Sequence, residues 1–314
     1  MVAVTHTIRL SGENHFGSKA PPAAPSVILR NLPDALRQSV LMSVEGRTSP
    51  RGRPPRWLEL SSDIRFVGLS GDDDTILHFE APTLGEAAED LYQQQELWNT
   101  RPNPGDSCFD LFGDVINDVR SCKEDSQRFD SRLLKKFKRL GAALDCDYDS
   151  ISIGGNRTNE NEAIITNEVV ANAARMVQGT PSPNRVRVVG MLDMIRASTE
   201  AFAIKLDDGQ EVAGVVSGGE VKGLPDLFQQ RVLVLGMAVY RPSGSLLRID
   251  AEQVSAANGE PSLWSRMPAP TKRKTDRTNI VQFQGPKSGL AAIIGKWPGD
   301  ESDEDIDAAL RQIS

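Results

Sequence analysis

Histidine, cysteine and aromatic residues are scarce in this 314-residue sequence. Its histidines have no second histidine or cysteine at the spacing of a metal-ligand pair: His6, His15 and His78. The cysteines form no CxxC pair, and their odd number and wide spacing fit a reducing compartment: Cys108, Cys122 and Cys146. We therefore expect no metal, no cofactor and a cytoplasmic location.

Catalytic and membrane signatures are missing as well. The sequence contains neither a GxSxG nucleophile motif nor a GxxxxGK[ST] phosphate-binding loop. It has no stretch of about 18 apolar residues, and its N-terminus lacks the basic-then-apolar pattern of a signal peptide. These absences predict a protein that is not an enzyme and that has no membrane partner.

Positive charge is not in excess either, since 36 Lys and Arg stand against 43 Asp and Glu, for a net charge of −7. Wholesale electrostatic binding of nucleic acid is therefore not expected, and any such binding needs a local basic patch.

One basic segment, Pro50-Arg-Gly-Arg-Pro-Pro-Arg56, resembles an AT-hook, whose Arg-Gly-Arg-Pro core lies in the minor groove of A·T-rich DNA. Gly52 lets the backbone approach the groove floor, and the flanking arginines follow its negative potential. The candidate nucleic-acid-binding residues, with one arginine just upstream, are Arg47, Arg51, Arg53 and Arg56. Because the segment lies between two predicted helices, a basic surface loop is the favoured alternative, and DNA is a secondary partner.

We predict an α+β fold in five consecutive parts: a flexible arm at 1–25, a mixed α/β domain at 26–178, an OB-like β-barrel at 184–255, a disordered linker at 256–287 and a partner-binding tail with short helices at 288–314. In the arm, Thr5 to Leu10 is expected to make one edge strand. The Ala20-Pro-Pro-Ala-Ala-Pro25 run has the composition of a linker.

The pattern of the first domain predicts helices and two hairpins. A helix is expected to begin near Pro33 and to stop at Gly46, and two more helices begin after Ser107 and Asp130, which suit the N-cap position. The hairpins pair 63–69 with 75–80 and 150–153 with 163–166, and a last helix covers 167–177. The basic residues of the helix after Asp130 are expected to form its solvated face: Lys135, Lys136, Lys138 and Arg139.

After a GTPSP boundary, the order of elements is βββ-α-ββ in about seventy residues, which is the order of an OB-fold. Its helix is expected over Glu220 to Gln230. Between Arg185 and Val254, eight Lys and Arg face nine Asp and Glu, and the aromatic residues are Phe202, Phe228 and Tyr240, the first two at core-like positions. This barrel is therefore interpreted first as a structural or protein-binding module and second as a nucleic-acid binder.

The C-terminal tail carries two short apolar faces. Trp297 and Pro298 lie between them, and an acidic run, Asp300 to Asp307, overlaps the start of the second. Neither predicted helix is long enough to be stable alone in water, so each needs a surface to cover it. The expected apolar anchors are Leu290, Ile293, Ile294, Trp297, Ile306, Leu310 and Ile313.

The same tail resembles a known family. Its sequence Gly295-Lys-Trp-Pro-Gly-Asp-Glu-Ser-Asp-Glu-Asp-Ile-Asp-Ala-Ala-Leu-Arg-Gln-Ile-Ser314 is similar to the C-terminal end of bacterial antitoxins encoded beside PIN-domain toxins. The resemblance implies that the tail binds and neutralises a metal-dependent ribonuclease, with Lys296 or Arg311 pairing with toxin carboxylates. Those antitoxins carry a small N-terminal DNA-binding fold, which this sequence does not show.

Two functions follow from the sequence. The first is an antitoxin-like protein whose tail neutralises a PIN-type ribonuclease. The alternative is a nucleic-acid-associated OB-fold protein, and a scaffold in a larger assembly also stays open because the first domain has no functional motif.

Overall fold

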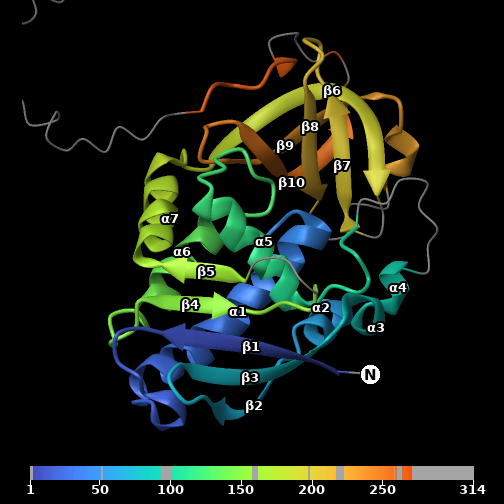
Figure 1. The fold of residues 1–314 in the computed structure, drawn as a ribbon. Coiled ribbons are helices and arrows are strands. Elements are labelled where there is room, and N and C mark those ends of the chain that lie inside the picture. The colour runs from blue at the N-terminus through green and yellow to red at the C-terminus, as the bar shows by residue number, and fades with distance from the viewer. Residues whose placement is uncertain are drawn as a thin grey trace, which may run out of the picture. The chain divides into compact units, whose positions relative to one another are not determined.

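The computed structural model describes residues 3–50, 52–92, 101–157, 162–196, 199–216, 223–257, 259 and 264–270. These residues form an antiparallel sheet with packed helices, followed by a closed five-stranded barrel (Figure 1). The predicted α+β class with a five-stranded barrel is therefore confirmed. The predicted tail, residues 288–314, lies outside the described residues, together with all of its proposed anchors and with Lys296 and Arg311.

The sheet of the first domain has the strand order β2-β3-β1-β4-β5, and its neighbouring strands are antiparallel. The strands are β1 (Ala3–Ser11), β2 (Arg65–Ser70), β3 (Thr75–Pro82), β4 (Ser150–Ile153) and β5 (Ala163–Thr166). The β2–β3 and β4–β5 pairs confirm both predicted hairpins.

Strand β1 overturns the prediction of a flexible arm with an edge strand. It lies in the middle of the sheet, between β3 and β4. Its burial alternates, so that His6, Ile8 and Leu10 are buried while Thr5 and Arg9 are exposed. Both edges of β1 are hydrogen-bonded to neighbours. The backbone of this segment is therefore satisfied by strands that are distant in the sequence, which local composition does not reveal.

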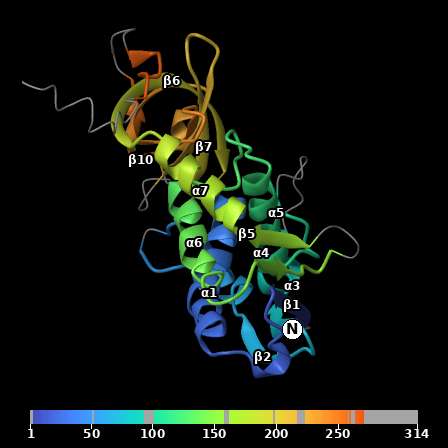
Figure 2. The same ribbon diagram turned by 60° about the vertical axis from the view of Figure 1, so that its left-hand side comes forward.

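Helices pack against the buried face of this sheet and share one apolar core with it. They are α1 (Ala23–Glu45), α2 (Arg56–Ser61), α3 (Leu84–Ala87), α4 (Glu89–Tyr92), α5 (Cys108–Arg120), α6 (Ser131–Gly141) and α7 (Asn167–Gly179), with a 3-10 turn η1 (Gly17–Lys19). Figure 2 shows α6 beside α7 and α1. Among the described residues, no helix has both the length and the apolar character to cross a bilayer.

Helix α1 begins well before the predicted start at Pro33, which lies inside it. Pro25 occupies the first turn instead, where a missing N–H costs nothing. The predicted end is confirmed, because Gly46 adopts a left-handed conformation with φ 69° and donates its N–H to the Met42 carbonyl.

The predicted N-caps of α5 and α6 are confirmed. Ser107 and Asp110 form a reciprocal capping box on α5, and Asp130 accepts the backbone N–H groups of Arg132 and Leu133 on α6. The prediction of a fully solvated basic face on α6 is wrong for one residue. Lys136 is buried and pairs with Asp34 of α1, because α6 packs against α1 along that side.

The barrel consists of β6 (Asn184–Arg196), β7 (Ala201–Lys205), β8 (Glu211–Val216), β9 (Arg231–Tyr240) and β10 (Leu246–Ala256). Its order is β10-β8-β7-β6-β9, and β10 closes it by pairing with β9 antiparallel and with β8 parallel. This closure agrees with the five-stranded Greek-key barrel that the βββ-α-ββ order predicts.

The helix predicted over Glu220 to Gln230 is much shorter. Within the described residues it is the 3-10 helix η4 (Pro225–Leu227). Leu224 is buried as expected, but Phe228 is 45% exposed instead of lying in the core. Phe228 has an extended backbone with ψ 135°, so the helical spacing that would place it beside Leu224 is lost.

Polar contacts join the first domain to the barrel, and both belong to one compact unit, Met1–Lys272. Arg248 of β10 donates to Asp130 over 3.3 Å, and both side chains are buried. The Ser245 hydroxyl donates to Asp125 over 2.8 Å. The two parts therefore meet around the N-terminus of α6 and the β9–β10 connection.

Candidate anion site between the first domain and the barrel

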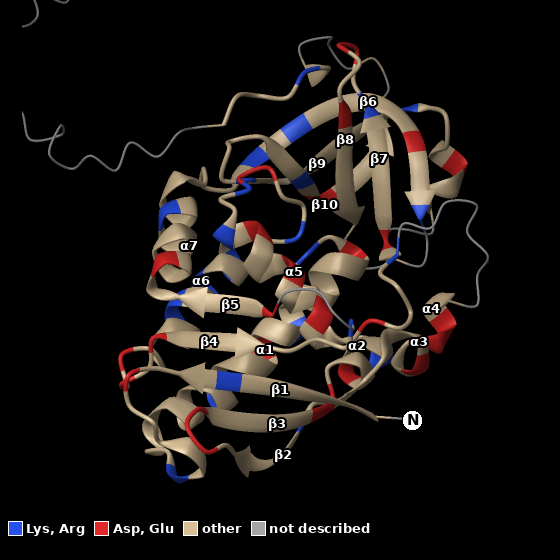
Figure 3. Ribbon diagram, viewed as in Figure 1, with Lys and Arg blue, Asp and Glu red and all other residues tan. Residues whose placement is uncertain are grey.

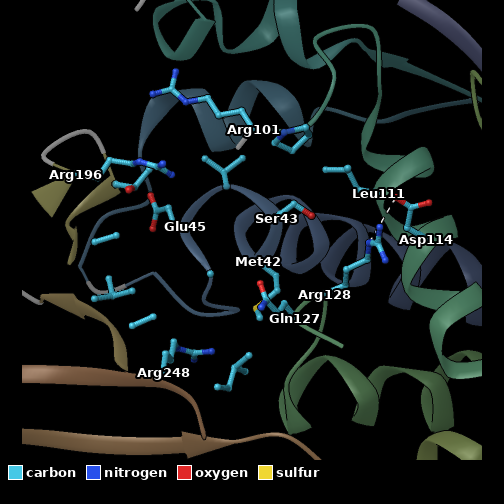
Figure 4. A pocket seen from close by; sticks show the side chains of 18 of the residues that line it. Met42, Ser43, Glu45, Arg101, Leu111, Asp114, Gln127, Arg128, Arg196 and Arg248 are labelled. Carbon is cyan, nitrogen blue, oxygen red and sulfur yellow. Dashed lines mark ion pairs between the residues drawn. The ribbon is translucent and has the colours of Figure 1, made fainter. Parts of the chain in front are cut away.

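A cavity of about 770 Å³ lies between the first domain and the barrel, and we call it the junction cavity. The first domain contributes the end of α1, residues 101–103 and parts of α5 and the α5–α6 loop, while the barrel contributes β6, β7, β8 and β10. Figure 4 shows Arg248 and Arg196 on the barrel side and Met42, Ser43 and Glu45 on the α1 side. Its lining combines apolar side chains with many guanidinium groups.

The junction cavity lies on one particular face of the barrel. Its barrel wall includes Ala201 and Phe202 of β7, Ala213 and Val215 of β8, and residues at the β6–β7 and β9–β10 connections. In OB-like barrels the second and third strands and these two connections form the face that binds oligonucleotides and oligosaccharides. In this protein the first domain stands against that face.

Arginine dominates the charged lining, although the chain as a whole is acidic. Six arginines line the cavity: Arg101, Arg128, Arg157, Arg196, Arg241 and Arg248. The acidic residues among its lining are Glu45, Asp106 and Asp114. Arginine therefore outnumbers the acidic residues of the lining in a protein whose net charge is −7.

Two of these arginines form ion pairs within the first domain. Arg157 makes a bidentate pair with Asp106, over 2.9 and 2.6 Å, and also donates to Asp114 over 2.9 Å. These hydrogen bonds to Asp106 raise the pKa of the guanidinium above its usual value. Arg128 donates to Asp118 over 3.0 Å and lies 3.7 Å from Asp114. Both charges are balanced by carboxylates on and near α5.

Arg248 differs from them because part of its guanidinium has no acceptor. Its side chain is 8% exposed, its Nε donates to Asp250 over 2.7 Å and its Nη2 donates to Asp130. Its Nη1 is buried and makes no hydrogen bond within the described structure. A buried N–H group without an acceptor is uncommon and costs free energy. Arg248 belongs to the cavity lining, so a small movement of its side chain would bring this donor to a ligand there.

Arg241 adds a second guanidinium from the same part of the barrel. It follows β9 and donates from Nη1 to the Leu246 carbonyl over 2.6 Å and to the Ser245 hydroxyl over 3.1 Å. Its Nε is buried and makes no hydrogen bond within the described structure. Burial lowers the pKa of Arg241, and the nearby Asp125 carboxylate opposes this shift.

On the opposite wall, Glu45 is held by Arg47, whose Nε donates to it over 2.6 Å. Burial raises the pKa of Glu45, and the Arg47 charge opposes this. Arg47 is the first of the four arginines that the sequence analysis predicts to bind nucleic acid. Its side chain is only 11% exposed and it also contacts Glu200, so it faces carboxylates and not solvent.

Of the described arginines of that set, Arg47, Arg53 and Arg56, none is among the residues that line the junction cavity. Arg53 and Arg56 are exposed, and Arg56 is the first residue of α2. Gly52 between them adopts a left-handed backbone with φ 77°. Arg51 lies outside the described residues. The exposure of Arg53 and Arg56 is compatible with a basic surface loop and with a DNA-binding loop.

Histidine chemistry is not concentrated anywhere in the described chain. His78 contacts the Ser70 hydroxyl over 2.6 Å in the β2–β3 pair, as a packed strand residue would. His6 lies against Phe109 in the core, with ring centroids 4.3 Å apart. Among the described residues, no group of three or more His, Cys, Asp or Glu has the geometry of a metal site.

Comparison with known proteins gives no relative: no family model, no curated protein and no solved structure matches this sequence. The residues of the junction cavity therefore carry the functional argument alone.

Sequence reasoning missed this site for a physical reason. Arg248 stands between Leu247 and Ile249, and a charged residue in such a strand is normally the one that faces solvent. Here the outward face of β10 is covered by the first domain. A register shift between Leu246 and Arg248, typical of a β-bulge, also changes where these side chains point. The only signal in the sequence is the excess of arginine over lysine in the barrel.

Proposed function

We propose that this protein binds single-stranded nucleic acid, with the junction cavity as its phosphate site. One observation carries the proposal: Arg248 belongs to the cavity lining, and its buried Nη1 has no acceptor within the described structure. A phosphate oxygen would accept a charge-assisted hydrogen bond from it, which is stronger than a neutral one. The proposal is also supported by the position of the cavity on the face that OB-like barrels use for oligonucleotides.

The size and apolar lining of the cavity suit a nucleotide. Its volume of about 770 Å³ lies within the usual range for ligand sites, roughly 300 to 1,000 Å³. Apolar side chains beside the arginines give a base a surface on which to lie: Met42, Leu111, Met194, Val215 and Leu247. A phosphate offers charged oxygen acceptors to the guanidinium N–H groups and a neutral oligosaccharide does not, so the anionic ligand is favoured.

The test measures binding of short labelled RNA and DNA strands by fluorescence anisotropy. We expect Arg248→Gln to weaken binding about tenfold or more, because a buried hydrogen bond to a charged group is worth about 1.5 to 3 kcal/mol. Arg241→Gln should weaken binding in the same direction. It provides a second variant, because Arg241 makes no ion pair within the described structure as Arg248 does.

A matched control is Arg185→Gln. Arg185 is also a barrel arginine, it is 72% exposed, and it pairs with Glu252 away from the cavity lining. Its loss should leave affinity unchanged, apart from a small effect on long-range attraction. Circular dichroism confirms that each variant is folded. Equal affinity of wild type, Arg241→Gln and a folded Arg248→Gln would overturn the proposal, as would no binding of any strand.

We propose as a second function that the C-terminal segment neutralises a PIN-type ribonuclease. The observation that favours it is the resemblance of Gly295 to Ser314 to antitoxin tails. In this proposal the apolar residues and Trp297 anchor the tail in the toxin, since buried aromatic residues commonly supply most of the binding energy. Lys296 or Arg311 pairs with the carboxylates of its metal site.

Growth rescue tests this second function. The full-length chain and a chain that ends at Lys287 are each co-expressed with a PIN-domain ribonuclease encoded next to this gene. The full-length chain should restore growth and the shortened chain should not. A full-length variant with Trp297→Ala should rescue poorly, because an aromatic hot spot contributes about 2 kcal/mol or more. Equal rescue by the full-length and shortened chains would exclude neutralisation by the tail.

A further inference from the structure

Binding along the interior of a strand needs features that the described barrel does not have. Proteins that track a single strand combine a basic groove with aromatic side chains on which successive bases stack. The aromatic side chain in the cavity lining, Phe202, is fully buried, and Tyr240 is 2% exposed. Figure 3 shows acidic and basic residues interspersed along the described strands and helices. A long strand would therefore gain little from the surface beyond the cavity.

The cavity also has walls on two sides. Met42 to Gly46 at the end of α1, with Arg101 and Pro102, belong to the first domain, and the barrel strands provide the other wall. A strand that continued in both directions would need an entrance and an exit between these walls. A strand end needs only one opening into such a cavity.

The end of a strand carries more charge, and more free phosphate oxygens, than its interior. A phosphate monoester at a terminus carries about 1.5 to 2 negative charges near pH 7, whereas an internal diester carries one. Arg241 and Arg248 each have one buried nitrogen without an acceptor. Val239 of β9 pairs with Arg248 of β10, and Arg241 lies two residues beyond Val239, so both arginines leave the same face of the β9–β10 pair. Two guanidinium groups on one face can share the oxygens of one monoester.

The acidic side chains near this wall have hydrogen-bond partners of their own. Asp130 also accepts the backbone N–H groups that begin α6 and the Thr48 hydroxyl, and Asp250 accepts from Arg248 Nε. Asp125 accepts hydroxyl groups from Ser243 and Ser245. Glu45, on the opposite wall, is paired with Arg47. These carboxylates orient the arginines, and the nitrogens without acceptors are left for a ligand.

We propose that the junction cavity recognises the terminal phosphate monoester of a single strand, with Arg248 and Arg241 as the phosphate-binding residues. The inference rests on the proposed function and narrows it, since a protein can bind strands without any preference for their ends. It also explains how an acidic chain can bind nucleic acid, because one terminal phosphate replaces the row of phosphate contacts that a basic groove would make.

The experiment compares four strands of one sequence by anisotropy or calorimetry: a strand with a phosphate at one terminus, a strand with it at the other, a strand with hydroxyl groups at both, and a closed circle. At least one phosphorylated strand should bind about tenfold more tightly than the hydroxyl-ended strand. The circle should bind no better than the hydroxyl-ended strand. The affinity should fall with salt by a slope near that of one or two phosphates, about −1 on logarithmic axes.

Variants assign the preference to the two arginines. Arg248→Gln and Arg241→Gln should each reduce the ratio between the phosphorylated and hydroxyl-ended strands towards one, while Arg185→Gln should keep the ratio of the wild-type protein. Because this ratio is measured within one protein, a general loss of stability does not produce the expected result. A ratio that is unchanged in both cavity variants would overturn the assignment.

The remaining outcomes separate the inference from the proposed function. Equal binding of all four strands, weakened in Arg248→Gln, would keep single-strand binding and overturn end recognition. Binding of inorganic phosphate or a nucleoside monophosphate without binding of any strand would overturn both. The absence of binding to every probe would do the same.

Discussion

His6 illustrates how a single residue in the core couples stability to pH. The ring is 1% exposed and stacks on Phe109, and Nδ1 lies 3.3 Å from the Gly154 carbonyl. Nε2 is buried and makes no hydrogen bond within the described structure. Burial lowers the pKa of His6 from its ordinary value of 6.5, and the Asp110 charge and the Gly154 carbonyl oppose this shift. The neutral ring is therefore the form that the fold accommodates.

We predict that the free energy of unfolding falls as the pH drops below about 6.5, because the unfolded chain then binds a proton that the folded chain excludes. Denaturant titrations between about pH 5 and pH 7 should show a smaller pH dependence in His6→Phe, which retains the ring stacking. Exposed His15, replaced by Asn, is the control and should show the wild-type dependence. The same slope in His6→Phe as in wild type would exclude His6 as the source.

Elements that depend on nearby residues were predictable from the sequence. The capping box of Ser107 and Asp110, the Gly46 stop and the two hairpins each depend on a short stretch of chain. The barrel was predictable too, because its order of strands and its strand lengths are visible in the alternation of apolar residues. Local preference and the final structure agree wherever the deciding contacts are close in sequence.

Elements whose role is set by distant partners were not predictable in the same way. The prediction of an edge strand for β1 failed because β4, its second neighbour, comes far later in the chain. The buried Lys136 depends on Asp34 of another helix. The junction cavity also depends on distant partners. Arg248 lines a cavity only because the first domain covers the outward face of its strand. The sequence shows which residues are charged, but it does not show which distant surface packs against them.

At the scale of the whole molecule, the site and the stability of the junction use the same residues. Arg248 pairs with Asp130, the residue that caps α6, and the same arginine belongs to the lining of the junction cavity. A bound anion would therefore strengthen the contact between the first domain and the barrel. Ligand at 100 times its dissociation constant would add about 2.7 kcal/mol to the free energy of unfolding.

We predict that breaking the Asp130–Arg248 pair uncouples the unfolding of the first domain from that of the barrel. Asp130→Ala removes the cap of α6 and leaves Arg248 paired with Asp250, so the loss should reach about 3 kcal/mol or more, as for other buried pairs. Calorimetry should show one transition for the wild-type protein and two, beginning at lower temperature, for Asp130→Ala. The control Asp207→Ala breaks the exposed pair with Arg231 in the barrel and should keep one transition. One unchanged transition in Asp130→Ala would mean that apolar packing alone couples the two parts.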